Sequence, residues 1–239
     1  MNITLIGFMG TGKTSVGKRL AKRLGWQFVD VDHMIESSAS KPISSIFAEH
    51  GEAVFRRFEQ RMIRHVARKD YQVIATGGGA FIDVQNRSRL RASGPVICLT
   101  ARPKVIFSRV SKRLDARPLL AAGVDPLSRI KALMQQRTSA YAQADLTIDT
   151  SDSSLEQVVK QVWEKISPYV CKSWQYLLNH ANDLGKRYGG KYIVVVDDRI
   201  VASGESHLQA YQNASARIHE KCDAGIYYIP LPQESVTAL

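Results

Sequence analysis

The amino-acid sequence predicts an α/β fold: a doubly wound, five-stranded parallel sheet with helices on both faces, followed by a small C-terminal α+β module. Two observations predict the sheet. Short apolar runs rich in β-branched residues alternate along the chain with longer stretches of helical character. Runs such as Ile3–Ile6 and Val96–Leu99 are apolar at nearly every position, which suits strands covered on both faces by helices.

The elements of the sheet domain follow in order from this alternation. The predicted strands are Asn2–Gly7, Gln27–Asp30, Gln72–Ala75, Pro95–Leu99 and Leu146–Ile148. The predicted helices are Lys13–Leu24, a pair around Ile43–Lys69, Val84–Ala92, Lys104–Arg113, Leu127–Ala144 and Ser154–Ile166. Ser154 can cap the last helix, which is expected to close before Pro168. Ligands of such a sheet bind at the carboxyl ends of its strands.

A second domain is expected after residue 170, so the chain divides into 1–170 and 171–239. Trp174–Arg187 has helical character, and Lys191–Val196 with Ile200–Ala202 predicts a hairpin that turns at Asp197 and Asp198. A helix over His207–His219 and a strand over Ile226–Ile229 complete a ββαβ module.

Composition, charge and cysteine spacing argue against a membrane-spanning, exported or disulfide-bonded protein. The chain has 239 residues and a net charge of +11, and the whole surplus lies in residues 1–170. No apolar run approaches the roughly 20 residues that span a bilayer, and the N-terminus has no features of an export signal. Cys98, Cys171 and Cys222 form no C-x-x-C pair, so free thiols in a reducing cytoplasm are expected.

Gly7–Thr14 matches the phosphate-binding pattern G-x-x-x-x-G-K-[ST], between a predicted strand and a predicted helix. Glycines allow the backbone N–H groups to surround a triphosphate, and the helix N-terminus adds a favourable field. Lys13 can neutralise phosphate oxygens, and Thr14 can ligate Mg²⁺. The alternative, a glycine-rich turn that binds nothing, is disfavoured because the flanking strand and helix both suit the mechanism.

Asp30 and Asp32 follow the second predicted strand. If that strand continues, alternation places both carboxylates on one side, near the phosphate loop. One could then serve Mg²⁺ through water and the other a substrate hydroxyl. The alternative is that an aspartate at a strand end caps the next helix.

Further polar groups suit a small-molecule pocket. Gly77–Gly79 directly follows the third strand, where the absence of side chains allows a ligand to approach the backbone. Arg56, Arg117 and Arg137 could converge on phosphate and carboxylate groups. Taken singly, an arginine on a helix is most often a solvated residue of the helix surface.

Together these motifs resemble those of the shikimate kinases over residues 1–170. The resemblance is carried by the following motifs: Gly7–Thr14, Asp30-x-Asp32, Phe47 ahead of Gly51-Glu52, Phe55-Arg56-Arg57-x-Glu59, Gly77–Gly79, Arg117–Leu120, and Arg137 with Tyr141. It implies a P-loop kinase fold, and transfer of the ATP γ-phosphate to the 3-hydroxyl of shikimate on the route to aromatic amino acids.

The resemblance also implies a role for each matching residue. ATP would contact Gly10, Thr11, Gly12, Lys13, Thr14, Ser15, Arg109 and Arg117; Mg²⁺ would be held by Thr14 and Asp30; and shikimate would contact Asp32, Phe47, Phe55, Arg56, Gly77, Gly78, Gly79 and Arg137. Asp32 would orient or deprotonate the attacking hydroxyl, with Lys13 and Arg117 as further catalytic residues. The implied partners are ATP and shikimate. From the composition and patterns of the sequence we expect no nucleic-acid or membrane partner and a cytoplasmic location. We expect a monomer, although the C-terminal module could dimerise or bind a regulator.

Alternative functions remain open at this stage. The nearest is another small-molecule kinase of the gluconate type, which Arg56 and the triple glycine disfavour. A second is a non-catalytic nucleotide sensor that acts through the C-terminal module. The module, which contains Gly190-Lys191-Tyr192 and Ala202-Ser203-Gly204, could regulate, dimerise or dock, or only stabilise the kinase domain. His180, His207 and His219 lack metal-ligand spacing.

Residues 112–124, which contain Arg117 and show little apolar periodicity, are expected to form a lid over the nucleotide. Replacing Arg117 with Ala is expected to lower kcat far more than ATP affinity, because an arginine on such a lid stabilises the charge of the transferred phosphoryl group mainly in the transition state. Steady-state kinetics and ATP titration measure the two effects. Equal losses in both would mean that Arg117 only binds ATP.

Overall fold

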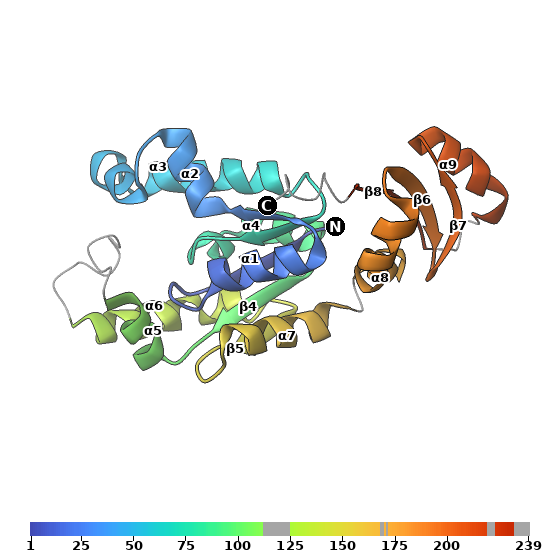
Figure 1. Cartoon of the computed structure of the whole chain (residues 1–239). Coiled ribbons are helices and arrows are strands. Elements are labelled where there is room, and N and C mark those ends of the chain that lie inside the picture. Colours follow the sequence, from blue (N-terminus) through green and yellow to red (C-terminus); the bar gives the residue numbers. More distant parts are fainter. Residues whose placement is uncertain (112–124, 168–169, 171, 219–222, 232–239) are drawn as a thin grey trace. The chain divides into compact units, whose positions relative to one another are not determined.

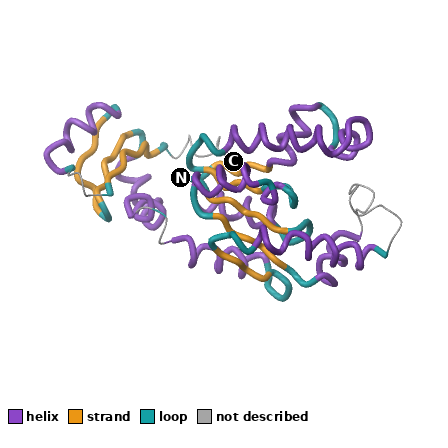
Figure 2. Tube along the Cα trace, turned by 180° about the vertical axis from the view of Figure 1, so that it is seen from behind, coloured by secondary structure: helices purple, strands orange, loops and turns teal. Residues whose placement is uncertain are grey.

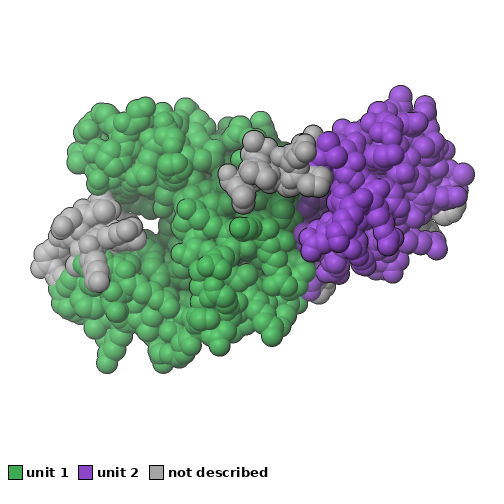
Figure 3. All heavy atoms as spheres, in the orientation of Figure 1, with its two compact units in different colours: residues 1–165 green, residues 166–239 purple. Residues whose placement is uncertain are grey.

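The computed structural model describes residues 1–111, 125–167, 170, 172–218 and 223–231. The chain forms two compact units, residues 1–165 and 166–239 (Figures 1 and 3). None of the helices in these described ranges is both long and apolar enough to cross a membrane.

Unit 1 is built on a five-stranded sheet in which every pairing is parallel, as the sequence predicts. Its order is β2-β3-β1-β4-β5, with β1 in the centre. The strands are β1 (Ile3–Gly7), β2 (Gln27–Asp30), β3 (Gln72–Ala75), β4 (Val96–Thr100) and β5 (Leu146–Asp149). Every residue of β1 is buried, because helices cover both faces of the sheet (Figure 2).

The helices of unit 1 are α1 (Lys13–Leu24), α2 (Val31–Ala39), α3 (Ile43–Val66), α4 (Val84–Ser93), α5 (Pro103–Val110), α6 (Pro126–Tyr141) and α7 (Leu155–Ile166), with a short 3₁₀ turn, η1, at Ala80–Ile82. Alternation along β1 separates the two faces. Ile6 packs in the cluster that includes Ile63 of α3 and Leu90 of α4, whereas Leu5 lies close to Gly17 of α1 on the opposite face.

One local expectation needs correction and another is confirmed. The second strand ends at Asp30, as predicted, and does not continue past it, because helix α2, which was not predicted, begins at Val31. The pair of helices expected around Ile43–Lys69 is confirmed, because α3 consists of two helical stretches that meet in a kink at Gly51. Gly51 has φ 75° and ψ 174°, a conformation that residues with a Cβ rarely adopt, so the kink occurs where glycine permits it.

Unit 2 has the predicted ββαβ order after an N-terminal helix. Its elements are α8 (Lys172–Tyr188), β6 (Lys191–Val196), β7 (Arg199–Gly204), α9 (His207–Ala214), the short 3₁₀ turn η4 (Ser215–Arg217) and β8 (Ala224–Ile229). The antiparallel sheet has the order β7-β6-β8. Ile193 and Val195 of β6 pack in the cluster that contains α8 residues, while Val194 and Val196 pack against Ala210 of α9.

Gly204 should be sensitive to substitution because a Cβ there would lie 2.6 Å from the backbone nitrogen of Ala210 at the start of α9. We expect Gly204→Ala to destabilise unit 2 by about 1–3 kcal/mol. Gly185, inside α8, is the matched control, since a Cβ there meets nothing within 4 Å. Gly185→Ala should stabilise by up to about 1 kcal/mol. Hydrogen-exchange protection of the β6 amides measures both changes, and equal protection in the two variants would contradict this packing argument.

Candidate active site

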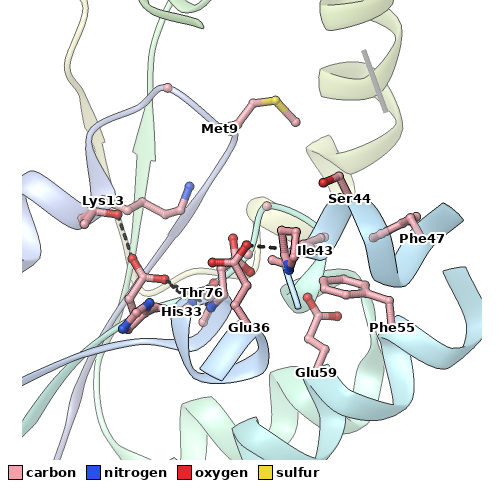
Figure 4. A pocket seen from close by; sticks show the side chains of 18 of the residues that line it. Met9, Lys13, His33, Glu36, Ile43, Ser44, Phe47, Phe55, Glu59 and Thr76 are labelled. Carbon is pink, nitrogen blue, oxygen red and sulfur yellow. Dashed lines mark hydrogen bonds between the residues drawn. The ribbon is translucent and has the colours of Figure 1, made fainter. Parts of the chain in front are cut away.

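A cleft of about 630 Å³ opens at the carboxyl ends of the central strands of unit 1. Figure 4 shows Lys13 on one side of it and Phe47, Phe55 and Glu59 on the other. Many residues selected from the sequence line it: Gly10, Gly12, Lys13, Thr14, Ser15, Asp30, Asp32, Phe47, Phe55, Arg56, Gly77, Gly78, Gly79 and Arg137. The fold therefore brings the phosphate loop and the polar groups from four other segments into one cavity.

The phosphate loop follows β1 and leads directly into α1. Gly10 and Gly12 have φ values of 77° and 94°, so both positions need a residue without a Cβ. Helix α1 has no side-chain cap and no acidic residue in its first turn, which leaves its N-terminal N–H groups and positive dipole end suited to an anion. The Lys13 ammonium donates hydrogen bonds of 2.9 Å to the carbonyls of both Gly7 and Phe8.

Asp30 links the phosphate loop to α2. Its Oδ2 accepts a 2.9 Å hydrogen bond from the Thr14 hydroxyl, and its Oδ1 accepts from the backbone N–H groups of Asp32 and His33. The helix-capping role considered from the sequence is therefore confirmed. Asp32 lies in the first turn of α2 rather than on the strand, so strand alternation is not what brings the two aspartates to the cleft. The Thr14 hydroxyl and the Asp30 carboxylate are the hard oxygen ligands that Mg²⁺ takes.

Two arginines reach the other end of the cleft from different helices. Arg56 of α3 donates hydrogen bonds of 2.8 Å to Glu59 and to Glu52. Arg137 of α6 is only 4% exposed, and its guanidinium carbon lies 5.1 Å from the centre of the Phe8 ring, over the ring face. A buried guanidinium beside a cavity is well placed for an anionic group of a ligand.

The three glycines after β3 are packed against these polar side chains. A Cβ on Gly77 would lie 2.6 Å from Asp32 Oδ1, and one on Gly79 would lie 2.6 Å from an Arg56 nitrogen. For Gly78 the distance to an Arg137 nitrogen would be 2.9 Å. Each glycine therefore makes room for a different charged side chain, a reason for the motif that differs from the predicted approach of a ligand.

Tyr141 and the two phenylalanines complete the walls of this region. The Tyr141 hydroxyl donates a 2.5 Å hydrogen bond to the carbonyl of Gly78, which fixes the glycine turn to α6. Burial raises the pKa of Tyr141 to about 12, so its hydroxyl stays protonated as a donor. The rings of Phe47 and Phe55 lie 4.8 Å apart on α3 and form an apolar wall.

Glu59 was noted in the motif but was given no role from the sequence. It is 1% exposed, among the buried residues of α3, and burial raises its pKa to about 7 despite the opposing charge of Arg56. Its Oε2 accepts from Arg56, whereas its Oε1 has no hydrogen-bond partner within the described part of the chain. The sequence does contain a sign of this burial, because Glu59 lies four residues after Phe55 and four before Ile63, on the apolar face of the predicted helix.

Two of the predicted nucleotide contacts, Thr11 and Arg109, are not among the residues that line the cleft. Thr11 is buried, and its hydroxyl donates to the carbonyl of Phe8. Arg109 of α5 donates to the carbonyls of Gly10 and Thr150, so it braces the phosphate loop from outside. Arg117 lies outside the described residues. The nucleotide roles of these residues remain predictions.

The chain matches two family models. The shikimate kinase model matches residues 9–167, and a family of unknown function, DUF5678, matches residues 183–232. Similar curated proteins are named shikimate kinase. One from Thermodesulfovibrio yellowstonii is 47% identical over 169 residues, which cover 70% of this chain and 96% of that protein. Another from Thermus thermophilus is 38% identical over 164 residues, covering 69% and 89% of the two chains.

The solved structures that resemble this chain also include shikimate kinases. A shikimate kinase from Acinetobacter baumannii, in complex with shikimate, aligns with a TM-score of 0.67 and 34% identity over 70% of this chain and 93% of that one. A shikimate kinase from Aquifex aeolicus aligns with a TM-score of 0.59 and 30% identity, over 71% and 98% of the two chains.

The buried Glu59 carboxyl should make the stability of the protein depend on pH. Its pKa is raised in the folded state from the ordinary value of 4.5 to about 7, so the folded protein holds this proton more tightly than the unfolded chain. Stability should therefore fall as pH rises from about 4.5 to 7, and Glu59→Gln should remove that part of the slope. Urea unfolding at several pH values measures it.

Glu52→Gln is the matched control, because Glu52 contacts the same arginine but is exposed. It should retain the pH slope of the unchanged protein. A Glu59→Gln slope equal to that of the control would show that Glu59 is ionised over this whole range.

Proposed function

The chain belongs to the shikimate kinase family, and from this premise we propose which residues of its cleft transfer the γ-phosphate of ATP to the 3-hydroxyl of shikimate. Members of this family are ATP- and Mg²⁺-dependent phosphotransferases with an alcohol acceptor, and this chain is one. The observation that carries the assignment of residues is that Lys13, Asp32, Arg56 and Arg137 line a single cleft.

At the phosphate end, the loop N–H groups and Lys13 bind the triphosphate. Lys13 already lies across the loop through its bonds to two carbonyls, so its ammonium has a short distance to move onto the β- and γ-phosphate oxygens. Thr14 and Asp30, which are in hydrogen-bond contact, would hold Mg²⁺. When bound there, the ion neutralises charge on the transferring phosphoryl group.

At the acceptor end, Arg56 and Arg137 bind the shikimate carboxylate. A hydrogen bond to a charged group contributes about 1.5–3 kcal/mol, so two guanidinium groups would supply much of the binding energy of a small acid. Glu52 and Glu59 hold the Arg56 guanidinium from two sides, which fixes its direction before the acid enters. These carboxylates therefore position the arginine.

Asp32 orients the attacking hydroxyl and accepts its proton. The place of Asp32 in the lining of the same cleft as Lys13 and the two arginines supports this role. The backbone at Gly78 and Gly79 would contact the acid, and Phe47 with Phe55 would pack against the ring. Positioning and charge neutralisation are the main demands of phosphoryl transfer, and these groups meet both.

The remaining predicted contacts complete the proposal. Thr11 and Ser15 would contribute backbone or hydroxyl groups around the phosphates, Arg109 would flank the adenine, and Arg117 would reach the transferred phosphoryl group. Every residue in this scheme belongs to unit 1, so the proposed reaction needs no residue from a second copy, and we propose a monomeric enzyme. We also propose that it acts in the cytoplasm. For unit 2 we retain three candidate roles: regulation, dimerisation or docking, and stabilisation of the kinase domain.

A coupled assay of ADP release, with ATP and Mg²⁺, tests the proposed function. We expect release to depend on shikimate, because Asp32 activates only a hydroxyl held in the acceptor site. Asp32→Asn should lower kcat by about 10²–10⁴-fold, and Lys13→Ala should abolish most of the activity. Asp183→Asn, the same change at an exposed site in α8, is the control and should leave kcat unchanged.

The alternatives give different results in the same assay. Release stimulated by gluconate rather than shikimate would support a gluconate-type kinase. Release that is indifferent to every acceptor, with intact ATP binding, would support a nucleotide sensor. Either result would overturn the proposal.

A further inference from the structure

The outer face of α3 carries a row of arginines that plays no part in the cleft. Arg57, Arg61 and Arg64 recur at intervals of four and three residues, and Arg68 follows in the turn after the helix. We call these four residues the arginine stripe. All four are exposed, and the helical spacing places Arg57, Arg61 and Arg64 on one face, opposite the buried residues Phe55, Glu59, Ile63 and Val66. These three span about 10 Å along the helix.

Nothing in the described part of unit 1 neutralises the stripe. No carboxylate among the described residues is within ion-pair distance of any of its four guanidinium groups. The nearest acidic residues in the helix, Glu52 and Glu59, are held by Arg56 on the cleft side. Like charges one turn apart destabilise a helix, so helix stability does not account for this row. Near the C-terminal end of the helix, Arg64 in the last turn gains from the helix dipole.

The neighbouring helix α4 extends the basic character of this surface and adds apolar side chains. Val84–Ser93 contains three arginines and no acidic residue, and α4 packs against α3. Gln60, on the outer side of α3, donates a hydrogen bond to Asp83, which also caps α4. The residues flanking Asp83 are unusually exposed for their type: Ile82 is 44% and Val84 67% exposed. Arginine is enriched at protein interfaces, and the two exposed aliphatic side chains add apolar surface that a partner could cover.

We propose that the arginine stripe, with Ile82 and Val84 at its side, binds an acidic helix of a partner protein. The guanidinium groups repeat once per helical turn, and carboxylates on a helix lying alongside repeat at the same interval, so several charge pairs can form in one register. Arginine also pairs with carboxylates through two parallel hydrogen bonds. Between Arg57 and Arg68 the exposed residues are the stripe itself and His65. There is no Phe, Tyr or Trp among them to stack on a base, and no aliphatic row to enter a bilayer.

Two synthetic peptides of about 20 residues and identical composition test the register. The matched peptide carries Glu at positions i, i+4, i+7 and i+11 with Leu beside them, and the scrambled peptide distributes the same residues around the helix. Fluorescence anisotropy with the full chain measures binding at low and at physiological salt. We expect the matched peptide to bind at least about tenfold more tightly, with an affinity that falls as salt increases. Equal binding of the two peptides would overturn the proposal.

Variants of the stripe arginines test whether the matched peptide binds at the arginine stripe. Arg57→Gln/Arg61→Gln/Arg64→Gln should lose at least about tenfold in affinity for the matched peptide while kinase activity, which reports folding, is unchanged. The control Lys18→Gln/Lys22→Gln removes exposed charges one turn apart on α1 and should bind as the unchanged protein does. Unchanged peptide binding by the triple variant would refute the assignment. So would tighter stripe-dependent binding of duplex DNA or of phosphatidylserine vesicles than of the matched peptide, since the partner would then belong to another class.

Discussion

The cleft depends on the close contact between three glycines and the charged side chains that lie against their backbone. Gly77, Gly78 and Gly79 each leave the space that a Cβ would occupy, and a different charged group lies against each of them. Because consecutive residues are only about 3.8 Å apart, this arrangement gathers two cations and a carboxylate along one short segment. A methyl group at any of the three would displace a charged group to which we assign binding or catalysis.

Burial of these charges also sets the electrostatics of the cleft. Arg137 is almost fully buried, and its guanidinium is over the Phe8 ring, so the phosphate loop itself supports the acid-binding end. Glu59 offsets the charge of Arg56 but is destabilised by its own burial, and its pKa rises accordingly. The lining of the cleft contains carboxylates as well as cations, so its charges are largely balanced inside the protein, and only the Arg137 guanidinium is nearly fully buried.

The surplus of positive charge has more than one structural role. Inside the cleft, arginines and Lys13 face the positions assigned to carboxylate and phosphates. On the outer face of α3, the arginine stripe is directed away from the cleft, with no acidic partner among the described residues. One helix therefore directs Arg56 into the cleft and its neighbour Arg57 to the outer surface, because successive residues of a helix project about 100° apart.

The sequence by itself determined the five parallel strands, the phosphate loop, the ββαβ module and most of the residues that line the cleft, because apolar periodicity and glycine-rich motifs are local signals. Only the tertiary structure decided the rest. Helix α2 begins at Val31 because Asp30 caps it, and Glu59 acquires its role from burial beside an arginine. The three glycines are needed because side chains from α2, α3 and α6 pack against their backbone. Such convergence arises from long-range packing, which no local pattern encodes.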